Sequence, residues 1–197
     1  MTERTTSYRA GMPSLTWLPA LDRPDLLAPA TAAVLAAWAA RVPAVADEVR
    51  VAEIDPALAD TATLNETFGL PASGSVNCVL VVGRRGGEER LAAAGVRATT
   101  RADVNTVVRR LLDVRKATFL ATDRATAESG MEYGGITFLG LPEHYRVLLD
   151  ASVATPDPQA GDRVLIGSGV RRSKLSLPGA LLAAAPGVEL VDGLALA

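Results

Sequence analysis

The segment SVNCVLVVGRRGGEERLAAAGV, residues 75–96, places two apolar runs on either side of a glycine pair. Its first nine residues are almost continuously apolar, which is typical of a strand that is covered on both faces. Gly86 and Gly87 can form a tight turn, because glycine adopts positive φ without a steric cost. The segment therefore predicts a β-hairpin whose first strand is central in a sheet.

Upstream of this hairpin the pattern predicts helix, strand and helix. Residues 26–40 are alanine-rich and apolar, but they are too few to span a membrane, so we expect a buried helix. Residues 48–55 alternate polar and apolar side chains, as a half-buried strand does. A second helix is predicted from Pro56 onward, and it should end at Gly69 and Pro71.

Downstream, TRADVNTVVRRLLDV (residues 100–114) has helical spacing. Thr100 and Asp103 are placed as a capping box, and a helix should bury the apolar positions Val104, Val107, Val108, Leu111 and Leu112. We expect further strands over 116–122, 145–153 and 162–170, and helices over 123–128 and 178–186. The irregular alternation of elements favours an α+β fold with a mixed sheet.

Composition limits the function classes. The chain has 197 residues, of which 49% are hydrophobic, and it carries a formal net charge of -2. One globular domain fits this composition, and we predict it over residues 21–197 with a flexible arm over residues 1–20. The net charge gives no strong field for DNA or membranes. With one cysteine and no export signal, we expect a cytoplasmic protein.

The residues that usually carry catalysis are scarce. His144 is the only histidine, so a histidine-based metal site is excluded and a catalytic triad would depend on that one residue. No phosphate-binding P-loop is present. Cys78 lies mid-strand, where a small buried hydrophobe is the favoured interpretation over a nucleophile. We therefore expect neither a metal nor a cofactor.

The segment SGMEYGGITFLGLP, residues 129–142, concentrates glycine in a short stretch. Glycine is used where the backbone must adopt positive φ or approach something closely. The stretch reads as a shaped loop, and the pattern leaves open whether the shape serves a ligand or only a turn. Tyr133 and Met131 could line a pocket or pack beneath the loop.

This loop, followed by VLIGSGVRRSKLSLPG (residues 164–179), resembles the YbaK/prolyl-tRNA editing domain family of aminoacyl-tRNA deacylases. The resemblance extends over roughly residues 59–194 and includes the order of the intervening pieces. It implies a curved, mostly antiparallel mixed sheet or a partly closed barrel flanked by helices. The implied substrate is the acceptor end of an aminoacyl-tRNA, with an aminoacyl-tRNA synthetase as a second candidate partner.

The resemblance also implies a mechanism and a set of site residues. Main-chain N–H groups of Gly134, Gly135 and Ile136 would face the ester carbonyl of a mischarged tRNA, and a positioned water would hydrolyse it. Selectivity would come from the size of the pocket. Asn77 stands where family members commonly carry a lysine, and Phe138 replaces a loop proline. The expected substrate-binding residues are Tyr133, Thr137, Phe138, Asp150, Ser168 and Gly169.

Several roles stay open at this point. Asp150 could orient a ligand or cap a turn. A basic patch for the acceptor stem would need the 100–114 helix and the last strand to lie side by side; otherwise the same charges are simply solvated. Its members would be Arg109, Arg110, Arg115, Lys116, Arg171, Arg172 and Lys174. The alternative to an enzyme is a catalytically silent module that binds an aminoacyl or nucleotide-like ligand.

Overall fold

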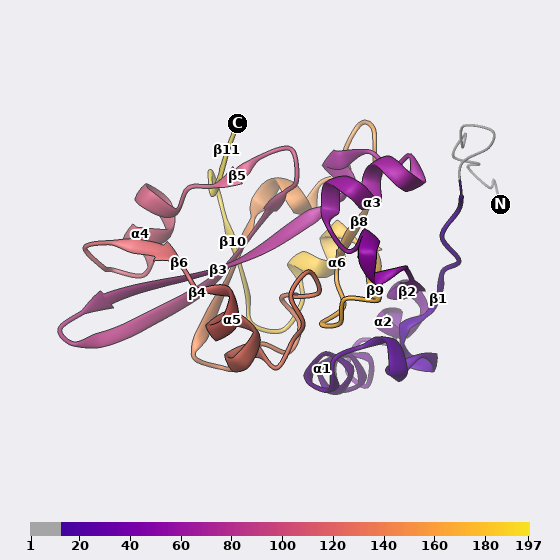
Figure 1. Ribbon diagram of the computed structural model, residues 1–197, viewed down its shortest axis with the longest axis horizontal. Helices are drawn as coiled ribbons and strands as arrows, with labels where there is room; N and C mark the ends of the chain where they lie inside the picture. The colour runs from indigo at the N-terminus through magenta and orange to yellow at the C-terminus, as the bar shows by residue number, and fades with distance from the viewer. Residues whose placement is uncertain (1–12) are drawn as a thin grey trace.

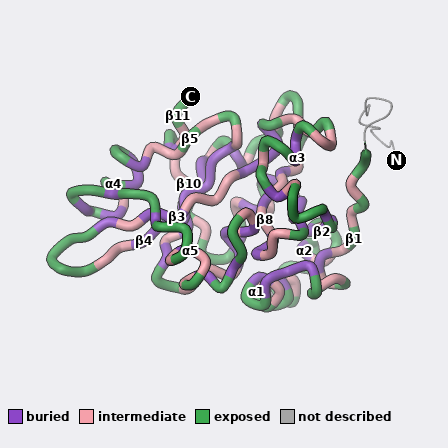
Figure 2. Tube along the Cα trace, viewed as in Figure 1, coloured by how far each residue is buried: buried purple, intermediate pink, exposed green. Residues whose placement is uncertain are grey.

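The predicted hairpin is the centre of the larger sheet in the computed structural model, which describes residues 13–197. β3 (Val76–Arg85) pairs antiparallel with β4 (Glu88–Arg97) along their whole length. Gly86 and Gly87 join them with φ of 59° and 87°, the positive values that a two-residue turn of this kind requires. The hairpin prediction is confirmed, and the tip is exposed in Figure 2.

The larger sheet has the order β10-β7-β4-β3-β6 (Figure 1). β4 pairs parallel with β7 and β7 pairs parallel with β10, whereas the ladders of β3 are antiparallel. Leu80 and Val81 belong to different core clusters, so β3 is covered on both faces here as predicted. The remaining strands are β6 (Ala117–Phe119), β7 (Tyr145–Asp150) and β10 (Val188–Val191).

A second sheet packs against the first and is antiparallel throughout, in the order β1-β2-β9-β8. A bridge between Ser75 and Leu165 joins it to the start of β3. Leu149 of one sheet and Leu175 of the other lie in the same core. The predicted α+β class is therefore confirmed. The strands are β1 (Leu18–Pro19), β2 (Arg50–Glu53), β8 (Arg163–Gly167) and β9 (Ser173–Pro178).

The helices lie around these sheets. α3 begins after Asp60, whose carboxylate accepts from the N–H groups of Ala62 and Thr63, and it ends at Gly69 with φ of 61°. A proline at the first turn sets the start of α1 three residues later than predicted. The helices are α1 (Pro29–Ala39), α2 (Ala44–Glu48), α3 (Thr61–Phe68), α5 (Thr122–Ser129) and α6 (Gly179–Ala183).

The predicted helix over residues 100–114 is wrong in its first turn. Residues 101–102 form β5 (Arg101–Ala102), which pairs with β11 (Ala195–Leu196), so their backbone is held in a strand. Asp103 alone caps the helix, and the Thr100 hydroxyl donates to the Arg97 carbonyl instead. A π-helical turn (Val104–Val108) then leads into α4 (Arg109–Leu111).

The N-terminal boundary also differs from the prediction. Residues 1–12 lie outside the described part of the chain, but Leu18 and Pro19 pair with β2 and Ala20 is fully buried. Residues 18–20 therefore belong to the folded domain, and the boundary at residue 20 lies too far along the chain. Across residues 13–197, no helix combines the length and the apolar character needed to cross a membrane.

Candidate functional site

A cavity of about 570 Å³ opens where the start of β3, the first turn of α3, β8 and the glycine loop meet. Four of the residues predicted to be catalytic or substrate-binding line it, namely Asn77, Tyr133, Gly134 and Ile136. The sequence therefore located this cavity from two separate segments. The other lining residues that matter below are Ala59, Asp60, Thr61, Cys78 and Lys174.

Two loops form one wall of the cavity by hydrogen bonding to each other. The N–H of Glu132 donates to the Gly169 carbonyl at 2.9 Å, and the N–H of Gly169 donates to the Gly135 carbonyl at 2.7 Å. The N–H of Gly135 donates to the Glu132 carbonyl at 2.9 Å and so closes a tight turn. Gly134 lies inside this turn with φ of 82°. The two motifs that carried the family resemblance are thus joined in space.

These contacts assign the glycines a different role from the expected one. A Cβ on Gly135 would lie 2.5 Å from the Val170 carbonyl, and a Cβ on Gly167 would lie 2.3 Å from the Gly135 carbonyl oxygen. Backbone packs on backbone here, so both positions need glycine for loop packing and not for ligand approach. The N–H of Gly135 is also used internally.

Two other main-chain donors of the loop remain open. Within residues 13–197, the N–H groups of Gly134 and Ile136 have no protein acceptor, and both residues line the cavity. A free N–H at a cavity wall can bind a carbonyl oxygen or an oxyanion.

Asn77 is oriented by a residue that the sequence did not single out. The Thr61 hydroxyl, in the first turn of α3, donates to Asn77 Oδ1 at 2.9 Å. Asn77 lines the cavity, and within residues 13–197 its NH₂ group has no hydrogen-bond acceptor. The sequence Asp60-Thr61 at the start of α3 was the signal that could have identified Thr61. The hydrogen bond from the Thr63 backbone N–H lowers the pKa of the Asp60 carboxyl.

Lys174 was predicted in an exposed RNA-binding patch, but it lies in the wall of the cavity. The residue is 6% exposed, and its Nζ donates to the carbonyls of Ala59 at 2.8 Å and Gly134 at 3.0 Å. Burial lowers the pKa of its ammonium to about 8, although the Asp60 carboxylate opposes that shift. A buried amine of this kind is typical of functional sites.

The thiol of Cys78 also lines the cavity. Burial of the sulfur raises the pKa of this thiol, although the residue as a whole is half-buried. The thiol is therefore protonated at neutral pH, and only a thiolate is a strong nucleophile. His144 is exposed beside Glu128, away from the cavity.

A family model for the aminoacyl-tRNA editing domain matches residues 55–184. The chain belongs to this family. The matched region contains the cavity residues described above, so the resemblance seen in the sequence is confirmed. No curated protein sequence matches the chain.

Solved structures show that the fold of this editing domain recurs at low sequence identity. A proposed trans-editing enzyme for prolyl tRNA synthetase is 18% identical with a TM-score of 0.65, over 84% of this chain and 97% of that one. The hypothetical protein APE2540 is 14% identical with a TM-score of 0.67, over 83% and 99%. A scaffold for computational epitope grafting is 19% identical with a TM-score of 0.64, over 87% and 99%.

Several residues expected at the ligand do not line the cavity of the editing domain. Phe138 is 3% exposed, and its ring fills the space above Gly95 in the main core. Asp150 accepts from the N–H groups of Ser152 and Ala195, which is the turn-capping alternative. Ser168 and Gly169 are buried against Ser173 and Ala28, and neither these two nor Thr137 lines the cavity.

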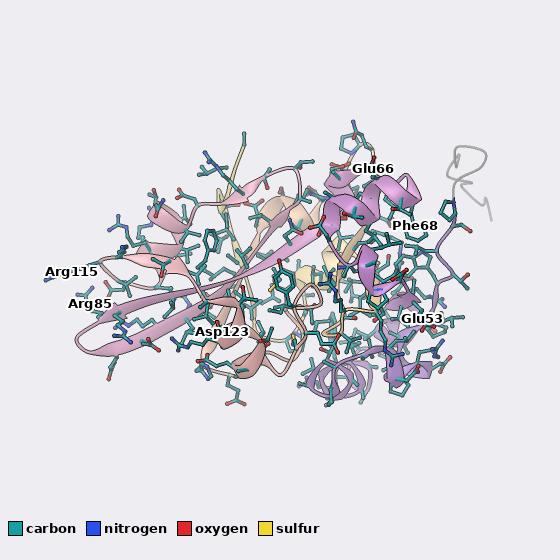
Figure 3. The ribbon with its side chains drawn as sticks, in the orientation of Figure 1. Glu53, Glu66, Phe68, Arg85, Arg115 and Asp123 are labelled. Carbon is teal, nitrogen blue, oxygen red and sulfur yellow. The ribbon has the colours of Figure 1, made fainter. Side chains whose placement is uncertain are left out.

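The predicted basic patch is divided between two ends of the molecule. α4, with Arg109 and Arg110, lies near the hairpin tip, far from β9 (Figure 1). Arg115, next to Lys116, points outward at that same end in Figure 3. The prediction of one continuous patch is wrong, because α4 and the last strand of the second sheet belong to different ends of the fold.

Arg171 is a basic residue in contact with Tyr133, which lines the cavity. Its guanidinium lies 5.8 Å from the centre of the Tyr133 ring and donates to the Tyr133 carbonyl at 3.1 Å. Tyr133 is 64% exposed. Arg172 points elsewhere, towards Glu53 and the Asp25 carbonyl. Among residues 13–197, no group of three histidine, cysteine or acidic side chains is placed to hold a metal ion.

Thr137 is a fully buried residue of the glycine loop, and within residues 13–197 its hydroxyl has no hydrogen-bond partner. Because a buried unpaired hydroxyl costs free energy, Thr137→Val is expected to raise the free energy of unfolding by about 1 kcal/mol. Urea unfolding measures it. Thr31→Val is the matched control, since that buried hydroxyl donates to the Leu139 carbonyl at 2.9 Å and its loss should destabilise. Equal losses in both variants would contradict the prediction.

Proposed function

We propose that this protein hydrolyses the ester bond of mischarged aminoacyl-tRNAs, as a separate deacylase acting in trans. The observation that carries the proposal is a single cavity lined by Asn77 and by Gly134 and Ile136, whose N–H groups have no protein acceptor within residues 13–197. Membership of the aminoacyl-tRNA editing domain family supports the substrate class.

The cavity offers donors for the charge that develops during hydrolysis. A water adds its hydroxyl to the acyl carbon, and the carbonyl oxygen becomes an oxyanion that the N–H groups of Gly134 and Ile136 stabilise. The bond from the acyl carbon to the ribose oxygen then breaks, and that oxygen receives the remaining hydrogen of the water. The products are a free amino acid and a tRNA with a free terminal hydroxyl.

Selectivity would follow from volume. The acyl side chain has to fit into the cavity of about 570 Å³ together with the ester and the terminal ribose, so the cavity walls limit its size. A pocket of this kind acts as a second sieve behind a synthetase, which discriminates weakly between side chains that differ by one methylene. We therefore expect the smaller amino acids to be removed.

The catalytically silent binding module remains the second candidate, and one observation favours it. The Cys78 thiol is protonated, and His144 lies outside the cavity. Among residues 13–197, neither of these side chains can therefore serve as a general base for the attacking water. A module of this kind would bind the aminoacyl end of a tRNA without turnover.

A panel of tRNAs mischarged with small amino acids separates the two candidates. The enzyme hydrolyses at least one of them, whereas the module binds saturably without releasing amino acid. Ile136→Pro removes one proposed donor N–H and is expected to lower kcat/KM about 100-fold. Ile136→Val keeps the N–H and should stay near the parent activity. Equal activity of the two variants, both folded by circular dichroism, would show that this amide is not used.

The tRNA path is tested by the salt dependence of binding. Tyr133 can stack on the terminal base and Arg171 can contact a phosphate, so Arg171→Ala should weaken tRNA binding and reduce the slope of log K against log salt by about one. The Arg109→Ala/Arg110→Ala double variant probes the other end of the molecule. A reduced slope in the double variant alone would place the RNA over α4 instead.

A further inference from the structure

Lys174 is a buried charged side chain that the mechanism above does not use. It is one of two lysines in the chain, and it is 6% exposed although it carries a primary amine. Burying an amine is unfavourable unless its hydrogens find acceptors. Its neighbours therefore determine whether the amine is structural or faces a ligand.

The hydrogen bonds of Lys174 leave one donor open. An ammonium has three N–H groups. The carbonyls of Ala59 and Gly134 accept from two of them, at 2.8 Å and 3.0 Å. Lys174 lines the cavity, so the third hydrogen is available there.

The charges around Lys174 favour a ligand with a hydrogen-bond acceptor for the ammonium. The Asp60 carboxylate and the Arg171 guanidinium are the charged groups whose fields reach the amine, and they act in opposite directions. Asp60 and Lys174 both line the cavity, but within residues 13–197 they form no ion pair. The Asp60 carboxylate instead caps α3. The amine is therefore not neutralised by a bound carboxylate.

We propose that Lys174 is a catalytic residue, whose ammonium donates its third hydrogen to the carbonyl oxygen of the bound acyl ester. The inference rests on the proposed deacylase function and deepens it. Lys174 contacts the carbonyl of Gly134, whose own N–H is one of the open donors, so the amine and the amide lie on the same wall of the cavity. The ammonium gives the oxyanion a cationic partner and transfers no proton.

Removal of the amine tests this role. Lys174→Met keeps an unbranched side chain that is one atom shorter but removes the donor and the charge, and it is expected to lower kcat/KM for a hydrolysed aminoacyl-tRNA about 100-fold. Arg146→Met removes a charge from an ion pair with Glu189 outside the cavity, and it should leave kcat/KM unchanged. A folded Lys174→Met protein within threefold of the parent would overturn the proposal.

Returning an amine to the cavity from another element gives a second readout. Asn77 lines the same cavity from β3, so Asn77→Lys in the Lys174→Met background brings an ammonium into the same space. We expect at least a tenfold recovery of kcat/KM, which a merely structural role of Lys174 would not produce. If this double variant is folded and no more active than Lys174→Met, an amine in the cavity is not what the reaction needs.

The pH profile of the unmodified protein keeps the proposal testable if Lys174→Met fails to fold. Burial lowers the pKa of Lys174 to about 8, so an activity that needs the ammonium should fall as the pH rises through that value. No fall in kcat/KM between pH 7 and pH 10 would overturn the role of the charged amine.

Binding of a non-hydrolysable ligand separates this inference from the deacylase proposal. The probe is 3′-amino-adenosine acylated with alanine, whose amide carbonyl accepts hydrogen bonds, and calorimetry should show about tenfold weaker binding to Lys174→Met. If the protein binds the probe but hydrolyses no tRNA, the deacylase proposal is overturned. The comparison of probe affinity between the parent and Lys174→Met then still decides whether Lys174 contacts the acyl carbonyl. Hydrolysis with equal probe affinity and equal kcat/KM in parent and variant overturns the inference alone. A protein that neither binds nor hydrolyses overturns both.

Discussion

Gly135→Ala is expected to lower the free energy of unfolding by about 3 kcal/mol. The new methyl group would lie 2.5 Å from both the carbonyl carbon and oxygen of Val170, which are backbone atoms that cannot rotate away. Overpacking of this kind in a fixed environment costs about 1–3 kcal/mol, and the upper end applies because two loops must separate. Chemical denaturation with urea gives the value directly.

Two further glycine variants make that result interpretable. Gly167→Ala disturbs the same contact from the other loop, because its methyl group would meet the Gly135 carbonyl oxygen at 2.3 Å, so a similar loss is expected. Gly86→Ala is the control for backbone strain alone, since Gly86 has φ of 59° with no atom within 4 Å of the added methyl, and it should cost only about 1 kcal/mol. Similar losses in all three variants would show that strain, and not loop packing, dominates.

The same contact connects stability to the site. Gly135 holds the turn that presents Gly134, and Gly134 in turn accepts from Lys174. A separated pair of loops would displace the open N–H groups and the amine together. Loss of activity in Gly135→Ala would therefore report the loop pairing, which is why Ile136→Pro is the variant that tests a donor N–H by itself.

The features that could be predicted from the sequence are those encoded locally. The Gly86–Gly87 turn, the apolar run of β3 and the stop signal at Gly69 each depend on a few neighbouring residues, and the hairpin and the end of α3 followed from them. The glycine loop was located for the same reason. The family resemblance linked the glycine loop to a second segment, residues 164–179. Local sequence patterns alone do not predict that these two segments meet.

The features that were missed depend on pairing between distant segments. Thr100 was expected to cap a helix, but residues 101–102 pair with residues 195–196 near the C-terminus. This pairing holds them in a strand, so the helix begins later. Lys174 looked like one of a run of surface charges, and only its place opposite Ala59 and Gly134 buries it. Phe138 was expected at the ligand, yet the space above Gly95 on β4 accommodates its ring.

Lys174 also makes the stability of the protein depend on pH. Burial lowers the pKa of its ammonium from 10.5 to about 8 in the folded state. Between these pH values the unfolded chain binds more protons at this residue than the folded chain does, so the free energy of unfolding rises with pH. Below pH 8 the lysine is charged in both states, and the folded protein carries the full cost of a buried charge, about 3 kcal/mol.

The measurement is the difference in unfolding free energy between the parent and Lys174→Met, taken by urea titration from pH 7 to pH 10.5. This difference should shift in favour of the parent by about 3 kcal/mol over that range, because all other titrating groups are common to both proteins. Lys116→Met is the matched control, because it removes the amine of an exposed lysine by the same substitution. A flat difference for Lys174→Met would mean that the amine is solvated in the cavity. A difference that shifts in favour of the parent as the pH rises means that the folded protein keeps a buried charge at a cost in stability. Such a cost is expected where a donor is positioned for substrate and not for stability.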